Sequence, residues 1–135
     1  MTIFGAIGVA GSGVTVYRKW LDAVSDNLAN MDNATRTSDN AFQARYIVAK
    51  AADNGDGSQG AQVAGIALGS AQGRVVNEPD NPLADSEGNV RYPDIDMASQ
   101  MGQMIMAQRG YQANLAVVDR AKDAYEAAIR LGSNV

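Results

Sequence analysis

The fold is decided by the two ends of the chain, and the first of them reads IFGAIGVAGSGVTVYRKWLDAVSDNLANM over residues 3–31. Apolar side chains recur in this stretch at alternating spacings of four and three residues, which places each at an a or d position of a heptad repeat. These positions are Ile3, Ile7, Ala10, Val14, Tyr17, Leu21, Val24, Leu28 and Met31. Charged and amide residues lie off this stripe, so the stretch predicts an amphipathic helix that needs a partner helix.

Four glycines, Gly5, Gly8, Gly11 and Gly13, lie off the apolar stripe of this helix. At roughly 1 kcal/mol each relative to alanine, they cost about 4 kcal/mol of helix stability. Two interpretations stay open: the glycines are simply tolerated, or they let a neighbouring backbone approach closely on a second face. Either way, we expect this helix to be poorly ordered in the isolated chain.

The other end of the chain predicts a second long helix that runs from about Asp94 or Asp96 to Leu131, with Gly132 as the residue that follows the helix end. Gln108 and Lys122 interrupt its apolar stripe at a positions. At 1.5 Å per residue the two helices would be roughly 42 and 54 Å long, too long for a compact globule of this size. The positions expected to pair the helices or to assemble copies are Ile7, Val14, Tyr17, Leu21, Val24, Leu28, Met97, Met101, Met104, Tyr111, Leu115, Val118, Tyr125 and Ile129.

The middle of the chain lacks a helical period and contains all three prolines. Short strand-like runs lie at residues 42–49, 62–68 and 73–76, and residues 53–58 between the first two have the composition of a hairpin tip. We therefore predict a mostly α fold with a small β insert, built on an elongated antiparallel pair of N- and C-terminal helices. The expected division is 1–31 for the first helix, 32–93 for the insert and 94–135 for the second helix.

Composition argues against catalysis and against nucleic acid as a partner. The 135 residues include no cysteine and no histidine, and the net charge is −4 with scattered basic residues. Residues 55–60 match GxGxxG, but the residues that follow predict a strand instead of the helix that would meet a pyrophosphate. Acidic groups near residues 53–56 and 80–87 lack EF-hand spacing. We expect no catalytic residues, no metal site and no cofactor.

Three local patterns resemble a known family. Residues 24–37, VSDNLANMDNATRT, resemble the SxNxAN…TRT signature of flagellar rod and hook proteins. Residues 78–96, EPDNPLADSEGNVRYPDID, resemble the DPxHPxADxxGYVxxPNVN stretch of the FlgC family of proximal rod proteins, and residues 104–114, MIMAQRGYQAN, are similar to that family's MIxAxRxYEAN. Asn81 and Asn89 stand where the family has His and Tyr, and Asp94 and Ile95 replace Asn and Val.

This resemblance implies a structural subunit of the bacterial flagellar basal body, located in the rod that spans the periplasm. It implies export without a cleaved signal peptide, in agreement with a first basic residue as late as Arg18. The implied partners are copies of the chain itself, the rod proteins FlgB and FlgF, and the rod-base adaptor FliE, with no insertion into the membrane. A sibling axial protein such as FlgB, a soluble helical adaptor or secretion chaperone, and a nucleotide-binding fragment remain the alternatives.

Overall fold

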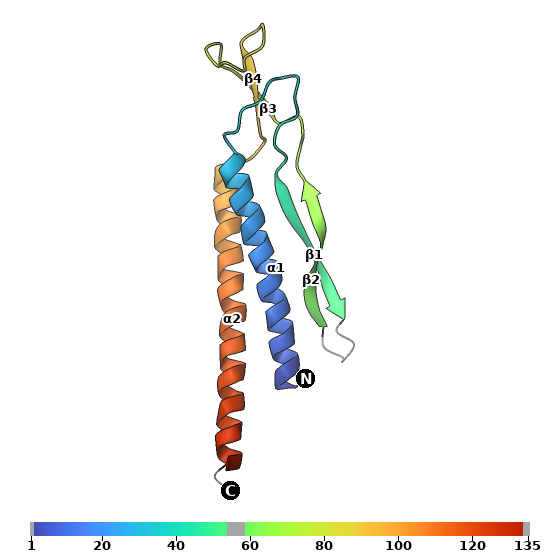
Figure 1. Ribbon diagram of the computed structural model, residues 1–135, viewed down its shortest axis with the longest axis vertical. Coiled ribbons are helices and arrows are strands. Elements are labelled where there is room, and N and C mark those ends of the chain that lie inside the picture. Colours follow the sequence, from blue (N-terminus) through green and yellow to red (C-terminus); the bar gives the residue numbers. More distant parts are fainter. Residues whose placement is uncertain (1, 54–58, 134–135) are drawn as a thin grey trace.

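Two long antiparallel helices form the body of the molecule. The computed structural model describes residues 2–53 and 59–133, and its outline is elongated (Figure 1). Helix α1 (Ile3–Asn30) rises from the end at which both chain termini lie, and helix α2 (Met97–Ser133) returns beside it. The predicted fold, mostly helical with a small antiparallel β insert between the helices, is confirmed.

Polar side chains mark where each helix begins. The Thr2 hydroxyl accepts a hydrogen bond from the Gly5 N–H at 3.1 Å at the start of α1. Asp96 does the same for α2, because its Oδ2 accepts from the Ser99 N–H at 2.7 Å. The expected end of α2 before Gly132 is wrong: the helix continues through that glycine to Ser133. Gly132 has no neighbouring atoms that a side chain would meet, so nothing there forces a break.

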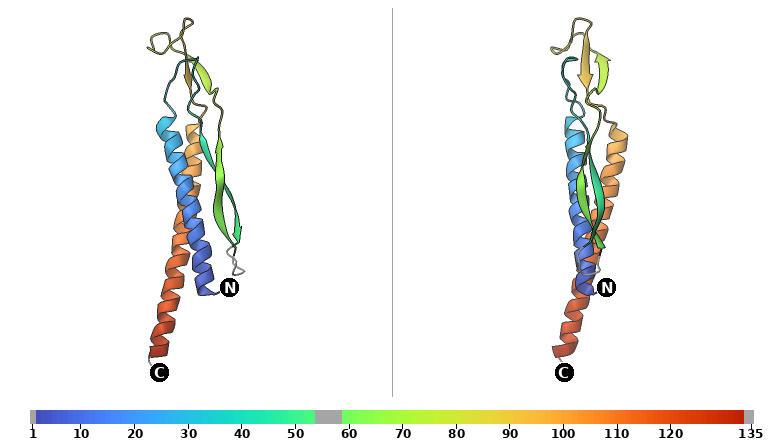
Figure 2. Two further views of the ribbon diagram at one scale, coloured as in Figure 1. Left: turned by 45° about the vertical axis from the view of Figure 1, so that its right-hand side comes forward. Right: turned by 90° about the vertical axis from the view of Figure 1, so that its right-hand side faces the viewer.

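A two-stranded antiparallel hairpin lies along the side of α1 that faces away from α2. Strand β1 (Arg45–Asp53) pairs with β2 (Gln59–Leu68), with a bulge between Val48 and Ala49. Figure 2 shows the hairpin running beside α1. Isolated hairpins are marginally stable in water, so this one depends on its contact with α1. Of the expected tip at residues 53–58, Asp53 is the last residue of β1, and residues 54–58 lie outside the described residues.

A second small sheet lies beyond the upper ends of the helices. Strand β3 (Arg74–Asn77) pairs antiparallel with β4 (Asn89–Tyr92), and Thr35 adds a single bridge to Arg91. The sequence pattern predicted β3 and missed β4, because β4 has only four residues and lies in a stretch rich in turn formers. Both strands stand above the helix pair in Figure 1.

The core is thin and built largely from small side chains. In the helix pair the buried residues include Val24 and Ala107. At the upper end of the molecule they include Val90, Pro93 and Ile95. Apolar burial stabilises in proportion to the area removed from water, at about 25 cal/mol per Å². A core of alanines and valines buries little apolar area and therefore stabilises the subunit only modestly. Many of its larger apolar side chains remain exposed to solvent.

Candidate assembly surfaces

The contact between α1 and α2 is made by small and polar residues. A Cβ placed on Gly110 would lie 2.4 Å from the Tyr17 ring, so the aromatic ring sits directly on the glycine. In the next turn the roles reverse, because the Asn114 side chain lies against Gly13, 2.6 Å from where a Cβ would be. The glycines thus let the two helices approach closely.

Further contacts extend the same pairing along both helices. The Trp20 Nε1–H donates to Gln103 Oε1 at 3.3 Å, and Asn27 Nδ2 donates to Gln100 Oε1 at 3.0 Å. At the far end the Phe4 and Tyr125 rings meet edge to face, 5.4 Å apart. In each facing pair the two sequence numbers have about the same sum. This is expected when two antiparallel helices keep one register along their whole contact.

The fourteen positions expected from the heptad pattern do not form one buried stripe. Val24 is buried, and eight others are half-buried: Ile7, Val14, Tyr17, Leu21, Leu28, Met104, Tyr111 and Val118. The remaining five are exposed: Met97, Met101, Leu115, Tyr125 and Ile129. Only Tyr17 and Tyr125 of this set take part in the contacts just described, so the role of the others in assembly stays a prediction.

The pairing face of α2 was missed because its residues are small or carry amides, without a large apolar side chain among them. It consists of Gln100, Gln103, Ala107, Gly110 and Asn114, which recur at spacings of three and four. That spacing was visible in the sequence, one position before the methionine stripe. A search for small and amide residues with a helical period would have found it, whereas a search for apolar residues selects the stripe beside it.

Helix α2 exposes apolar side chains on both sides of its contact with α1. At 3.6 residues per turn, one group falls on one flank of the contact and a second group on the other. The first flank consists of Met97, Met101 and Leu115 and extends at Ile105 to the side opposite the contact, and the second flank consists of Met106 and Val117. With Met97 and Met106 each more than half exposed, this helix is not covered by its own chain.

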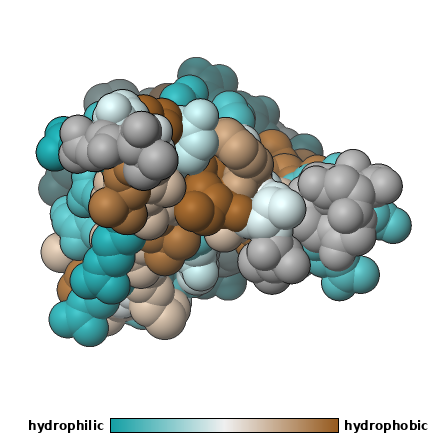
Figure 3. Space-filling model, turned by 90° about the horizontal axis from the view of Figure 1, so that it is seen from below, coloured by the Kyte–Doolittle hydropathy of each residue, from teal (hydrophilic) through white to brown (hydrophobic). Residues whose placement is uncertain are grey.

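The end of the molecule that carries both termini is also apolar. Because α2 has 37 residues and α1 has 28, α2 extends past the start of α1, as Figure 1 shows. Ile3 and Phe4 are exposed here, and Leu131 is 73% exposed. Figure 3 looks at this end from below and shows hydrophobic residues gathered near its centre.

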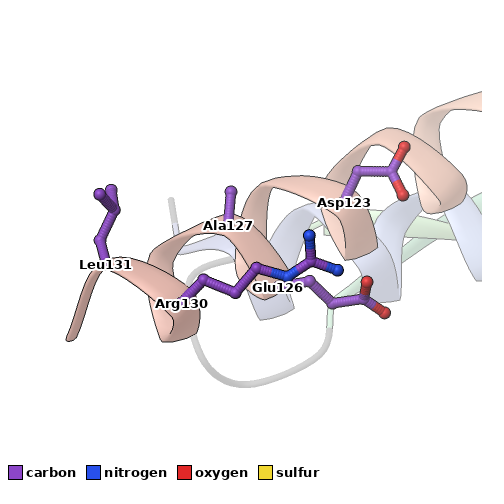
Figure 4. Close-up of a pocket in the computed structure, with 5 residues that line it drawn as sticks. All are labelled: Asp123, Glu126, Ala127, Arg130 and Leu131. Carbon is purple, nitrogen blue, oxygen red and sulfur yellow. The ribbon is translucent and has the colours of Figure 1, made fainter. Parts of the chain in front are cut away.

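The last turns of α2 offer a hollow in the surface but no enclosed site. Figure 4 shows the residues that line it, all of them on the one helix: Asp123, Glu126, Ala127, Arg130 and Leu131. A single helix cannot surround a small molecule as a ligand pocket does. This hollow therefore lacks the enclosure of a ligand pocket.

The hairpin adds a third exposed surface. Two apolar grooves lie between it and α1, and one of them has a volume of about 280 Å³ between Tyr17, Trp20 and Ile47. Val16, Ile47 and Ala61 contribute to both grooves. On the strands themselves, Tyr46, Val48, Ile66 and Leu68 are exposed. The hairpin thus leaves apolar side chains uncovered although both of its strands contact α1.

A polar network holds the loop between β3 and β4. The Asp85 carboxylate accepts hydrogen bonds from the Asn89 and Glu87 N–H groups at 2.9 Å and from the Thr37 hydroxyl at 2.8 Å. These bonds, that from Asn89 foremost, lower the pKa of Asp85. Nearby, the Tyr92 hydroxyl donates to Glu78 at 3.0 Å, which raises the pKa of the tyrosine.

The two asparagines at the family's His and Tyr positions have defined roles in this loop. Asn81 Oδ1 accepts from the Leu83 N–H at 3.0 Å, while its Nδ2 donates to Glu78 at 2.9 Å. Asn89 Oδ1 accepts from Asn77 Nδ2 at 3.0 Å across the β3–β4 pair. Asn81 therefore keeps the turn-forming function expected of asparagine, whereas Asn89 makes a cross-strand contact at the start of β4.

Acid should loosen this loop. A folded pKa below the usual value of 3.8 means that the Asp85 carboxylate stabilises the loop at higher pH, and that this stabilisation is lost as the pH falls through the folded pKa. We expect the Asn89 and Glu87 amide signals in NMR spectra to move together in an acid titration with a midpoint below 3.8. In the variant Thr37→Val, which removes one hydrogen bond, the midpoint should rise. An unchanged midpoint in that variant would contradict the assignment.

The described residues were also compared with the arrangements that metal binding and membrane insertion require. No group of three or more His, Cys, Asp or Glu residues there is arranged to hold a metal ion. Of the described helices, none is both long and apolar enough to cross a membrane. On residues 59–68 the structure forms strand β2, so the GxGxxG match does not open a helix.

The fold and its surfaces define an elongated helical subunit whose apolar faces are left for neighbouring chains to cover. Comparison with known proteins identifies the family to which this subunit belongs. Residues 86–131 match the family described as flagellar basal body rod FlgEFG protein C-terminal. The flagellar basal-body rod proteins FlgC of Salmonella typhimurium and Yersinia enterocolitica are 32% and 34% identical over 133 residues, covering 98% of this chain and 99% of theirs.

A further FlgC protein matches over nearly its whole length at lower identity. FlgC of Bacillus subtilis is 26% identical over 149 aligned residues, which cover 98% of this chain and 99% of that protein. The chain belongs to the FlgC family of flagellar basal-body rod proteins, and it is a structural subunit of the rod. Similarity over 98% of the chain favours this family over the sibling axial families considered above.

Proposed function

We propose that this subunit polymerises through its terminal helices into the hollow, torque-transmitting shaft of the proximal rod, and that its role is structural and not catalytic. The observation that carries this proposal is the exposure of apolar side chains on both flanks of the α1–α2 contact. A two-fold dimer would use the same patch on both copies. Two different apolar flanks instead favour head-to-tail contacts, which generate rings or helices.

Neighbouring rod components fit the ends and sides of the subunit. The exposed residues Ile3, Phe4 and Leu131 at the lower end would be covered by an axial neighbour, either another copy or a FlgB, FlgF or FliE subunit. The β1–β2 hairpin would brace copies at larger radius. We further propose that the chain reaches the periplasm-spanning rod without a cleaved signal peptide.

Charge placed on the first flank of α2 should abolish assembly and leave the monomer folded. Met101 and Ile105 are each 49% exposed, so the double substitution Met101→Glu/Ile105→Glu removes few contacts within the chain. In an interface, however, each carboxylate would have to lose its water without a partner. We expect unchanged far-UV circular dichroism but no rods in electron micrographs of basal bodies from a complemented deletion strain.

The matched control for this pair is Met101→Leu/Ile105→Leu, which keeps both positions apolar at similar volume. This variant should assemble rods and restore swarming. Complete rods in the Glu variant would refute a role of this flank in polymerisation. If the protein served only as an export adaptor, rods would be intact in both the Glu and the Leu variant.

The glycine-rich start of α1 is expected to order fully only on assembly. Gly8 and Gly11 have no atoms within reach of an added Cβ, so their cost in helix stability is not offset by close packing within the chain. Circular dichroism of dilute monomer should therefore show fewer helical residues than the 28 of α1 and 37 of α2 together. Gly8→Ala/Gly11→Ala should raise this signal. Full helicity of the unmodified monomer from Ile3 onward would contradict the expectation.

A further inference from the structure

Two buried amides lie where α1, α2 and β1 meet. Among the described residues, Asn27 at 0% and Gln100 at 2% exposure are the buried polar side chains. Burying an amide destabilises a protein unless hydrogen bonds replace those made with water. Each of these side chains therefore restricts the arrangements in which the chain can fold.

Asn27 satisfies its amide with two different elements. Its Oδ1 accepts from the Arg45 N–H at 2.7 Å, and its Nδ2 donates to the Arg45 carbonyl at 3.0 Å. The side-chain amide thus pairs with the first residue of β1 as a neighbouring strand would. The second proton of Nδ2 goes to Gln100 Oε1 on α2, also at 3.0 Å.

Elsewhere the helices are joined by the longer, part-buried Trp20–Gln103 hydrogen bond at 3.3 Å and by packing at Gly110 and Gly13. Alanine and glycine surfaces can slide past one another by a turn, because apolar contact is not directional. Hydrogen bonds are directional and short-ranged. A shift of one helical turn displaces Gln100 from Asn27 by about 5.4 Å, which breaks their bond.

We infer that Asn27 and Gln100 are the residues that select the register of α1 against α2 and, through Arg45, the position at which the hairpin attaches. A single buried polar residue fixes register in coiled coils in the same way. The Arg45 side chain reinforces the attachment through an ion pair with Asp26 at 2.6 Å. A further consequence for assembly rests on the proposed polymerisation. If α2 were shifted by one turn against α1, its two exposed flanks would be displaced and would no longer match the surface of the next copy.

Disulfide formation can report the register directly, because the chain has no cysteine of its own. Gly13→Cys/Asn114→Cys reports the native register, since the position of a Cβ on Gly13 is 2.9 Å from Asn114 Cγ. Gly13→Cys/Val118→Cys/Asn114→Ala reports a shift of one turn, because Val118 lies one turn beyond Asn114 on α2. The Asn114→Ala substitution makes room for the new side chain at position 13. Both reporters are measured in the full-length chain with Asn27 and Gln100 intact, where only the native disulfide should form.

The decisive variant is Asn27→Leu/Gln100→Leu, which keeps the site filled and removes both amides. We expect retained helicity and a ratio of native to shifted disulfide that falls about tenfold or more, as loss of a buried hydrogen-bonded pair implies. A native disulfide alone, with helicity retained, would overturn the inference, because the Tyr17–Gly110 and Asn114–Gly13 packing would then select the register.

A milder variant, Gln100→Met, decides the matter if the double variant unfolds. It removes only the bond between the helices, so the shifted disulfide should appear while hydrogen exchange at the Arg45 amide stays slow. A native disulfide alone in Gln100→Met, or loss of helicity in both variants, would overturn the inference, since the amides would then support the fold without selecting a register. Shifted monomers that still build normal rods would refute only the consequence for assembly.

Discussion

Replacing Gly73 by alanine should lower the free energy of unfolding by roughly 3 kcal/mol, from backbone strain and overpacking together. Gly73 has φ +56°, a left-handed conformation that residues with a Cβ rarely adopt. A Cβ there would lie 2.1 Å from the Tyr92 carbonyl oxygen and 2.8 Å from the Ala41 Cβ. Because the first of these atoms is backbone, β4 itself would have to move.

Urea denaturation followed by circular dichroism measures this loss. The matched control is Gly65→Ala in strand β2, where an added Cβ meets no atom within 4 Å. That variant should be neutral or slightly stabilising, because alanine has less conformational freedom to lose on folding. Equal stability of the two variants would show that the turn before β3 is not held as described.

Replacing Gly110 by valine should separate the paired helices. The new side chain would occupy the space of the Tyr17 ring, which is itself stacked on Trp20 at 6.1 Å between centroids. Overpacking of this kind costs about 1–3 kcal/mol, and more where the neighbour cannot turn away. Since α1 is the helix that joins α2 to the hairpin, we expect lower stability together with loss of rod assembly.

Gly102→Val on the same helix is the control for Gly110→Val. Gly102 has open space around its Cβ position, so the same substitution tests helix propensity without packing. Valine is a somewhat better helix former than glycine, and this variant should gain a few tenths of a kcal/mol. Similar destabilisation in both variants would contradict the close approach of the two helices at Gly110.

The heptad pattern predicted the helices correctly, but along α2 the stripe that meets α1 lies one position before the methionine stripe that the pattern selects. Met97 and Met101 fit a coiled-coil stripe, and in a two-stranded coiled coil they would be buried. In the subunit they are exposed, while the neighbouring stripe of Gln100, Ala107 and Gly110 meets α1. The period of the apolar residues identifies a helix face that must be buried against another surface. It does not say whether the cover comes from the same chain or from another.

The same distinction applies to the glycines. Gly13 was expected to lie off the apolar stripe, and the idea that glycines let a backbone approach closely holds at this position, where Asn114 packs against it. Gly8 and Gly11 look equivalent in the sequence but have no neighbour in the subunit. Which glycine is needed for packing depends on what lies opposite, and that partner is about 100 residues away along the chain.

The sequence by itself determined the two long helices, because their amphipathic period and end signals act over a few residues. It also determined the family, through the motifs in residues 24–37, 78–96 and 104–114. Only the tertiary structure decided which stripe pairs α1 with α2, where β4 lies, and that Asn27 binds both Gln100 and Arg45. These features depend on contacts between distant segments, where a close fit of small residues and the satisfaction of buried amides outweigh hydrophobicity.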